Sequence, residues 1–206
     1  MNTATQTTLP ESTWRTLFAE LRPALRLFLV LSLITGLIYP MLITGIAQGI
    51  FAHEANGSLI LRDGKAVGSA LIGQPFSDAK YLWGRPSATA PQPYNALASS
   101  GSNLGPLNPA LADAVKARID TLRTAQPAQL GPVPQELVTA SASGLDPHVS
   151  PQAALWQLDR IARARSIPAS QVRAIMDKYT ELPTLGLFGE TRVNVLQVNL
   201  ALDELK

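Results

Sequence analysis

The most apolar stretch of the chain lies near its amino terminus. No formally charged side chain occurs between Arg26 and Glu54, and most of the 27 residues between them are aliphatic. A helix needs about 20 consecutive apolar residues to cross the hydrocarbon core of a bilayer. The pattern therefore predicts one transmembrane helix over residues 27–52. We expect a kink near Tyr39-Pro40, because Pro40 lacks an amide donor and crowds the preceding turn.

Basic residues flank this helix unequally. Arg15, Arg22 and Arg26 precede it, whereas Arg62 and Lys65 are the basic residues that follow closely. Short flanks rich in Lys and Arg stay in the cytoplasm. We therefore expect residues 1–26 to form a cytoplasmic tail and residues 53–206 to form one compact extracytoplasmic domain.

Small residues near the end of the predicted helix have more than one interpretation. Gly45 and Gly49 have the spacing that lets two membrane helices approach closely. With Pro40 and Gln48 they suggest a helix that packs against another protein, although incidental glycines are at least as common. Ala47 and Gly49 also suit a signal-peptide cleavage site. The apolar part of a signal peptide spans only about 7–15 residues, so a retained anchor is favoured.

Beyond the helix, the hydrophobic pattern changes to short segments separated by turns. Residues 58–72 contain two short apolar runs around Asp63-Gly64, which predicts a β-hairpin. Residues 73–109 are rich in the turn formers Gly, Pro, Ser and Asn. Large apolar side chains recur throughout this segment, whereas disordered segments contain few of them. We therefore expect long loops that are ordered and packed.

Three later segments carry helix-start signals. Asn108-Pro109, Ser150-Pro151 and Pro168 each precede apolar residues at helical spacing. Residues 193–202 fit either a short strand or a fourth helix, with the helix slightly favoured. The predicted fold class is therefore α+β, with a β-hairpin, long ordered loops and about three to four helices. The second helix contains three arginines that we expect to face largely outward: Arg160, Arg163 and Arg165.

Composition argues against several functions. Residues 54–206 contain 14 Lys or Arg and 13 Asp or Glu, without the basic face that nucleic acids require. The chain has no cysteine, so disulfides and thiolate metal sites are excluded. Its two histidines, His53 and His148, lack the spacing of a metal site. Asp146-Pro-His148 most simply forms a turn; a catalytic dyad is the less favoured alternative, because it also needs a positioned nucleophile.

No phosphate-binding loop and no serine-nucleophile motif occurs in the sequence. We therefore expect no catalytic residue, no metal site and no cofactor bound by the chain itself.

Four stretches of unusual composition resemble the C subunit of the Kdp potassium-transporting P-type ATPase of bacteria. They are residues 68–76, residues 84–106, residues 133–148 and residues 189–196. The resemblance implies a non-catalytic subunit of an inner-membrane complex. Its implied partners are a channel-like potassium-binding subunit, a P-type ATP-hydrolysing subunit and a small single-span subunit. The family is described as a catalytic chaperone that raises the ATP affinity of the ATP-hydrolysing subunit.

The predicted topology conflicts with direct contact between this chain and ATP, because it places the loops opposite the cytoplasmic nucleotide site. The alternative is a domain that caps the outer mouth of the channel-like subunit. Such a cap affects ATP use only through conformational coupling, which requires different affinities for two states of the pump. ATP is then involved indirectly, through the ATP-hydrolysing partner.

The polar residues of the family-like stretches have two interpretations. They pin the loops by internal hydrogen bonds, or they contact the channel-like subunit, which is most credible for Asn95 and residues 100–106. These residues are Gln74, Arg85, Tyr94, Asn95, Ser102, Asn103, Ser141, Ser143, Asp146, His148 and Asn194. Two other classes of protein remain open, an anchored extracytoplasmic hydrolase and a ligand-binding or sensory module.

Overall fold

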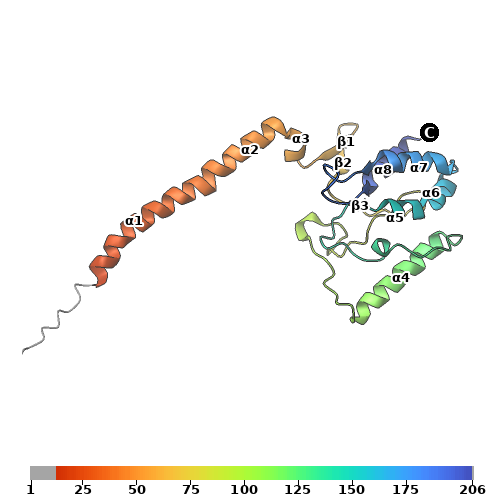
Figure 1. Ribbon diagram of the computed structural model, residues 1–206, viewed down its shortest axis with the longest axis horizontal. Coiled ribbons are helices and arrows are strands. Elements are labelled where there is room, and N and C mark those ends of the chain that lie inside the picture. The colour runs from red at the N-terminus through yellow and green to blue at the C-terminus, as the bar shows by residue number, and fades with distance from the viewer. Residues whose placement is uncertain (1–12, 206) are drawn as a thin grey trace, which may run out of the picture. The chain divides into compact units, whose positions relative to one another are not determined.

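The computed structural model describes residues 13–205, so the first 12 residues of the predicted tail lie outside the description. The chain separates into two units, residues Met1–Asn56 and Gly57–Lys206 (Figure 1). Within the first unit a long helix consists of α1 (Thr13–Leu33), a π-helical turn η1 (Ile34–Ile38) and α2 (Tyr39–Ile50), followed by the short α3 (Ala52–Ala55). We call Thr13–Ile50 the anchor helix and the second unit the head domain.

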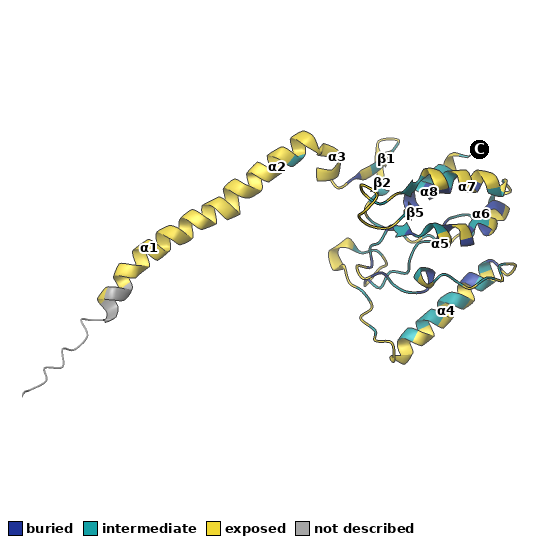
Figure 2. Ribbon diagram, in the orientation of Figure 1, coloured by how far each residue is buried: buried dark blue, intermediate teal, exposed yellow. Residues whose placement is uncertain are grey.

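The anchor helix is apolar and uncovered. Its mean hydropathy reaches 2.2 between Phe18 and Ile50, and none of that window is buried (Figure 2). It is therefore long and apolar enough to cross a membrane. The helix begins well before residue 27, because the residues ahead of the apolar run are mostly strong helix formers such as Ala, Leu, Glu and Arg.

A π-helical turn lies just before Pro40, where the sequence predicted a kink. The backbone stays α-helical at Leu33 and Tyr39, and the residues between them form the π-helical turn. Pro40 cannot donate a hydrogen bond to the carbonyl of Gly36, and its ring would crowd that carbonyl in a regular α-helix. The wider π turn accommodates both effects while the helix continues.

The head domain is α+β, as predicted. Its strands are β1 (Leu59–Arg62), β2 (Lys65–Ser69), β3 (His148–Val149), β4 (Thr180–Glu181) and β5 (Arg192–Asn194). Its α-helices are α4 (Pro109–Ala125), α5 (Pro151–Trp156), α6 (Leu158–Arg165), α7 (Ala169–Lys178) and α8 (Val195–Glu204). Two short 3-10 helices are η2 (Ala96–Ala98) and η3 (Gln135–Leu137).

The predicted hairpin is confirmed. Strands β1 and β2 pair antiparallel, and the turn residues Asp63 and Gly64 have φ angles of 52° and 73°. Two successive positive φ angles are typical of the type I′ turn, whose twist matches that of the paired strands.

A second antiparallel sheet has the strand order β3-β5-β4. His148 on β3 pairs with Asn194 on β5, and Thr180 on β4 pairs with Val193. This register places two family-like stretches, far apart in the sequence, on adjacent strands.

The predicted helix starts are confirmed, with two differences. Asn108 and Ser150 cap α4 and α5 by accepting hydrogen bonds from the amides of Ala110 and Ala153. The second predicted helix is split into α5 and α6 at Gln157. The last segment forms both expected alternatives in succession, because Asn194 ends β5 and then caps α8.

The main core lies where helices α5 to α8 cover the second sheet. Its fully buried members include Val149, Ile161, Val172, Val198 and Leu202. Leu122 of α4 and Leu137 of η3 join the same cluster. The loops that carry the family-like stretches pack around this core.

Candidate functional site

Tyr94 links three of the family-like loops. Its hydroxyl donates to the carbonyl of Arg85 at 2.5 Å, and its amide donates to Oγ of Ser87 at 2.9 Å. Gly73 leaves room for its ring, because a Cβ at position 73 would lie 2.3 Å from Cε1 of Tyr94. Burial and the nearby Asp146 charge raise the pKa of Tyr94 to about 12, so its hydroxyl stays protonated and donates at neutral pH.

Asp146 joins two basic residues. Its Oδ2 lies 3.2 Å from Nη1 of Arg85, and its Oδ1 lies 3.5 Å from Nδ1 of His148. The amide of His148 donates to the same Oδ1 at 3.0 Å, which forms the predicted turn. Burial alone would raise the pKa of Asp146, but the hydrogen bonds from His148 and the charge of Arg85 lower it. The carboxylate is therefore ionised at neutral pH and fixes both neighbours.

The ring of His148 faces a carboxylate and an amide. Its Nε2 lies 3.7 Å from Oε1 of Glu181 and 3.5 Å from Nδ2 of Asn194. Within residues 13–205, no hydrogen bond joins this ring to a hydroxyl group, and no group of three metal-ligating side chains is present. The arrangement orients the two strands. It places no hydroxyl group where His148 could activate it as a nucleophile.

Two amide side chains tie the β1–β2 hairpin to the rest of the head domain. Asn194 is buried, donates to the carbonyl of Ala70 at 2.9 Å and accepts from the amide of Gln197 at 3.1 Å. Gln74 donates to the carbonyl of Val67 at 2.8 Å. Because Gly68 has no Cβ, Nε2 of Gln74 can approach its backbone closely.

Hydroxyl groups bind the loop around residue 90 to the loop around residue 144. Ser87 donates to the carbonyl of Gly144 at 2.7 Å, and Thr89 donates to the carbonyl of Gln92 at 2.7 Å. The predicted residue Ser141 is buried next to this contact, and its amide donates to the carbonyl of Pro86 at 3.3 Å. These bonds give the irregular loops a defined shape.

The predicted residues Asn95 and Ser143 also make bonds within the head domain. Asn95 donates to the carbonyl of Ala90 at 3.2 Å and accepts from the amide of Leu97 at 3.1 Å, which caps η2. The carbonyl of Ser143 accepts from Oγ of Ser99 and from the amide of Ser100, both at 3.0 Å.

Ser102 and Asn103 differ from the other predicted residues. Both are exposed, and no side-chain hydrogen bond of either is present within the described part of the chain. Asn103 has a φ angle of 51°, a left-handed conformation that asparagine tolerates. Leu97 and Leu107, which flank this stretch, are almost fully exposed as well. The 97–107 loop therefore presents both polar and apolar groups to its surroundings.

Sequence reasoning missed two buried amides that clamp the loop ahead of Gly84. Asn199 on α8 accepts from the amide of Leu82 at 2.7 Å and donates to its carbonyl at 2.9 Å. Gln157 does the same for Trp83, at 2.9 Å and 3.0 Å. Each amide thus replaces the backbone partner that a neighbouring strand would supply. Isolated amides in otherwise apolar segments were the available signal.

The prediction that Arg160 and Arg165 face largely outward is wrong. The Arg165 side chain is 12% exposed and donates to the carbonyls of Lys80 at 2.7 Å and Leu202 at 2.6 Å. Arg160 is only 3% exposed, stacks 4.2 Å from the ring of Trp83 and donates to Oε1 of Gln157 at 2.6 Å. Burial lowers the pKa of Arg160 to about 10, so it remains charged at neutral pH. A helical pattern alone predicts that arginine faces solvent. The planar guanidinium of arginine can instead stack on the face of an aromatic ring.

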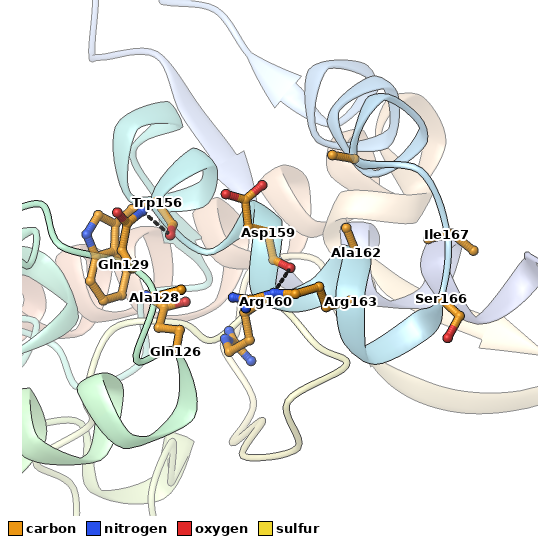
Figure 3. A pocket seen from close by; sticks show the side chains of 11 residues that line it. Gln126, Ala128, Gln129, Trp156, Asp159, Arg160, Ala162, Arg163, Ser166 and Ile167 are labelled. Carbon is orange, nitrogen blue, oxygen red and sulfur yellow. Dashed lines mark hydrogen bonds between the residues drawn. The ribbon is translucent and has the colours of Figure 1, made fainter.

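A cavity of about 550 Å³ lies between the end of α4 and helices α5 to α7. Gln126, Trp156 and Arg160 line it (Figure 3). Four of their buried atoms have no hydrogen-bond partner among the described residues: Nε2 and Oε1 of Gln126, Nε1 of Trp156 and Nε of Arg160. Polar atoms in such a position are ordinarily satisfied by bound water.

In the anchor helix, the predicted packing residues have open surroundings. Within residues 13–205, a Cβ at Gly45 or Gly49 would meet no atom beyond its own helical turns within 4 Å. Gln48 bonds to Asn56, with Oε1 accepting from Nδ2 at 3.1 Å, which ties the end of α2 to α3. The helix therefore completes its own polar contacts there but leaves its small-residue face uncovered.

The chain thus combines one apolar helix of membrane-spanning length with a head domain of mutually pinned loops, which suggests the class of single-pass membrane proteins. The family model for the K+-transporting ATPase c chain, KdpC, matches residues 21–204. The potassium-transporting ATPase KdpC subunit of Polaromonas naphthalenivorans is 64% identical over 186 residues, covering 90% of this chain and 95% of that protein. The KdpC subunit of Dechloromonas aromatica is 59% identical over 183 residues, covering 89% and 96%.

A third relative gives the same result. The KdpC subunit of Sorangium cellulosum is 59% identical over 187 residues, covering 91% of this chain and 98% of that protein. The chain belongs to the KdpC family and is a subunit of a potassium-transporting ATPase complex, as the four sequence stretches predicted.

Proposed function

We propose that this chain is a non-catalytic accessory subunit, anchored in the bacterial inner membrane with residues 53–206 outside the cytoplasm. The unequal basic flanks of the anchor helix support this orientation. The polar residues of the family-like stretches are mostly engaged with one another, which suits a scaffold better than an active site. This mutual engagement is the observation that carries the proposal.

The head domain caps the outer mouth of the channel-like potassium-binding subunit. The 97–107 loop is the contact that we assign to this role, because Ser102 and Asn103 are exposed while most of the other predicted polar residues are bonded internally. Loops held by a rigid scaffold commonly carry binding function. Gly45 and Gly49 provide a second contact, where the anchor helix packs against a membrane helix of the complex.

ATP is involved indirectly, through the ATP-hydrolysing subunit. A cap that binds one state of the pump more tightly than another shifts the population of that state. By linkage, this shift changes the affinity of the ATP-hydrolysing subunit for ATP without contact between ATP and this chain. The chaperone role of the family is thereby a coupling between two sites on opposite sides of the membrane.

Affinity purification of the full chain from membranes in mild detergent tests the proposal. We expect the chain to recover the channel-like, ATP-hydrolysing and small single-span subunits. Recovery of the chain alone would contradict the proposal and reopen the hydrolase and ligand-binding alternatives.

A paired substitution tests the role of the 97–107 loop. Ser102→Ala with Asn103→Gly removes both side chains, and glycine keeps the left-handed backbone at position 103. We expect slower potassium uptake with an unchanged thermal unfolding midpoint of the head domain. Normal uptake would exclude this loop as the contact.

A further inference from the structure

The cavity between the end of α4 and helices α5 to α7 is lined by buried polar groups that the chain itself does not satisfy. Gln126 is 1% exposed and Arg160 is 3% exposed, and Trp156 is buried as well. Among the described residues, the Gln126 amide group, Nε1 of Trp156 and Nε of Arg160 have no hydrogen-bond partner. Figure 3 shows the three side chains around one cavity of about 550 Å³. Small-molecule sites in proteins have volumes of about 300–1,000 Å³, so this cavity has room for a ligand.

Arg160 is a buried cation without a paired anion. Its Nη1 donates to the carbonyl of Ala79 at 2.8 Å and its Nη2 donates to Oε1 of Gln157 at 2.6 Å, and both acceptors are uncharged. Within the described part of the chain, no ion pair joins Arg160 to a carboxylate. The charge of Asp78 acts on it only from beyond ion-pair distance, and Asp78 lies 3.9 Å from Lys80. Since a buried charge is costly unless it is paired, the cavity favours an anion.

The other charges along the cavity do not remove this preference. Arg163 and Asp159 also line the cavity, and both are exposed. Nε of Arg163 donates to the backbone carbonyl of Asp159 at 3.1 Å. The lining side chains therefore carry two positive charges and one negative charge. Water can satisfy hydrogen bonds in the cavity, but it carries no charge to balance the Arg160 guanidinium.

The unpartnered atoms specify the hydrogen bonds of an occupant. The Nε–H of Arg160 and the indole N–H of Trp156 can only donate, and a carboxylate group can accept from both. The Gln126 amide group needs a donor as well as an acceptor, and a hydroxyl group is both. Chloride provides no donor, a neutral molecule leaves the charge unbalanced, and an α-amino acid would bring its ammonium group close to two arginines.

We propose that this cavity binds a small hydroxycarboxylate. Its carboxylate accepts from Nε of Arg160 and Nε1 of Trp156, and its hydroxyl group bonds to the Gln126 amide. Gln126 ends α4, whereas Trp156 belongs to α5 and Arg160 to α6. The ligand thus ties α4 to the helices that cover the second sheet. None of these residues belongs to the 97–107 loop or to the anchor helix, so ligand binding is a function separate from assembly of the complex.

Ligand-dependent unfolding of the full chain in detergent tests this site. Glycolate is the probe, and glycolamide is its uncharged control of similar shape. We expect glycolate to raise the unfolding midpoint of the head domain by roughly 5–10 °C when its concentration is about 100 times its dissociation constant. Glycolamide should have a much smaller effect, because it leaves the Arg160 charge unbalanced.

A matched pair of glutamine variants locates the binding. Gln126→Met keeps the length of the side chain and removes its amide group. Without glycolate its unfolding midpoint should equal or exceed that of the wild-type chain, because the substitution removes a buried polar group that has no partner in the chain. The glycolate-dependent shift should be lost. Gln171→Met is the control, because Gln171 is exposed on α7, and it should retain the full shift.

Trp156 provides an independent spectroscopic readout. In the full chain labelled with ¹⁵N-tryptophan, glycolate should move one indole N–H resonance, and that resonance should be absent from Trp156→Phe. The phenylalanine variant keeps an aromatic ring and loses only the indole donor.

Several results would overturn the proposed site. They are the absence of any glycolate-dependent shift, equal shifts with glycolate and glycolamide, and an undiminished shift in Gln126→Met. A larger shift with chloride or sulfate at the same ionic strength would also overturn it, because the cavity would then select charge without the carboxylate and hydroxyl groups.

Discussion

Glycines have different surroundings in the anchor helix and in the head domain. At Gly45 and Gly49 of the helix, an added Cβ would meet no atom of the described chain within 4 Å other than its own helical turns. At Gly68 and Gly73 of the head domain, it would lie 2.2 Å from Nε2 of Gln74 and 2.3 Å from Cε1 of Tyr94. The head glycines allow close contacts that the chain makes with itself, and the helix glycines leave space for contacts from outside.

Residues that stabilise the head domain therefore differ from residues that are available for membrane insertion and complex assembly. In the head domain, polar and small residues are used to pin long loops onto the core. In the anchor helix, apolar side chains and small residues face outward. Substitutions in the first set should change the unfolding of the head domain, whereas substitutions in the second should change membrane insertion or complex formation.

The largest effect is expected from a charge in the anchor helix. Leu33→Arg should cost about 2.5–3.5 kcal/mol of insertion free energy, because arginine near the bilayer centre loses its hydration. Carbonate extraction of membranes measures the inserted fraction. Leu130→Arg, at an exposed leucine of the head domain, should leave insertion unchanged. Equal insertion of both variants would contradict the assignment of this span.

Overpacking beside Tyr94 should give the next largest effect. Gly73→Ala forces a methyl group against the Tyr94 ring and the carbonyl of Asp146, so the head domain should lose about 1–3 kcal/mol of unfolding free energy. Gly131→Ala is the control, because its nearest atom lies at an ordinary 3.7 Å. Denaturant unfolding of the two variants measures the difference. Equal stabilities would show that the crowding around Gly73 relaxes freely.

Loss of the Asp146 charge should have a smaller, pH-dependent effect. The fold lowers the pKa of Asp146, so its carboxylate stabilises the head domain above the unfolded pKa of about 3.9, and this contribution is lost as pH falls through the folded pKa. Asp146→Asn should therefore cost about 1–2 kcal/mol at pH 7. The difference from the wild-type chain should shrink below about pH 4.

Unfolding at pH 7 and pH 3 tests this dependence. Asp113→Asn, at an exposed aspartate on α4, is the control and should have little effect at either pH. A destabilisation by Asp146→Asn that persists undiminished at pH 3 would show that the ion pair with Arg85 is not its cause.

The smallest effect on the head domain is expected from the helix glycines. Gly45→Leu with Gly49→Leu should leave its unfolding midpoint unchanged, because both positions lie in the anchor helix and, among the described residues, a Cβ there would meet no atom beyond its own helical turns within 4 Å. The yield of the purified complex should fall, since the larger side chains prevent close helix packing. An unchanged yield would dismiss the packing face.

Local rules explain which parts of the fold were predictable. The Asp63-Gly64 turn, the caps at Asn108 and Ser150 and the start of α7 after Pro168 each depend on a few neighbouring residues. The apolar run of residues 27–52 likewise predicts the anchor helix from its own composition. In these cases the chemistry of the segment itself selects the structure.

Contacts between distant segments explain what was missed. Nothing near Gln157 or Asn199 reveals that their amides clamp the backbone of Trp83 and Leu82. Arg160 is buried where Trp83 offers its ring and where Oε1 of Gln157 and the carbonyl of Ala79 accept its hydrogen bonds. The pairing of Arg85 with Asp146, 61 residues apart, likewise depends on how the loops return to the core. Such partners are set by tertiary packing, which periodicity does not contain.

The location of the head domain outside the cytoplasm is the central claim, and site-specific labelling tests it most directly. The chain has no cysteine, so a single introduced thiol reports one position without background. With Leu130→Cys, at an exposed position outside the 97–107 loop, a membrane-impermeant maleimide added to spheroplasts should label the chain, whereas with Glu20→Cys labelling should require lysis. Labelling of Leu130→Cys only after lysis would place the head domain in the cytoplasm and contradict this topology.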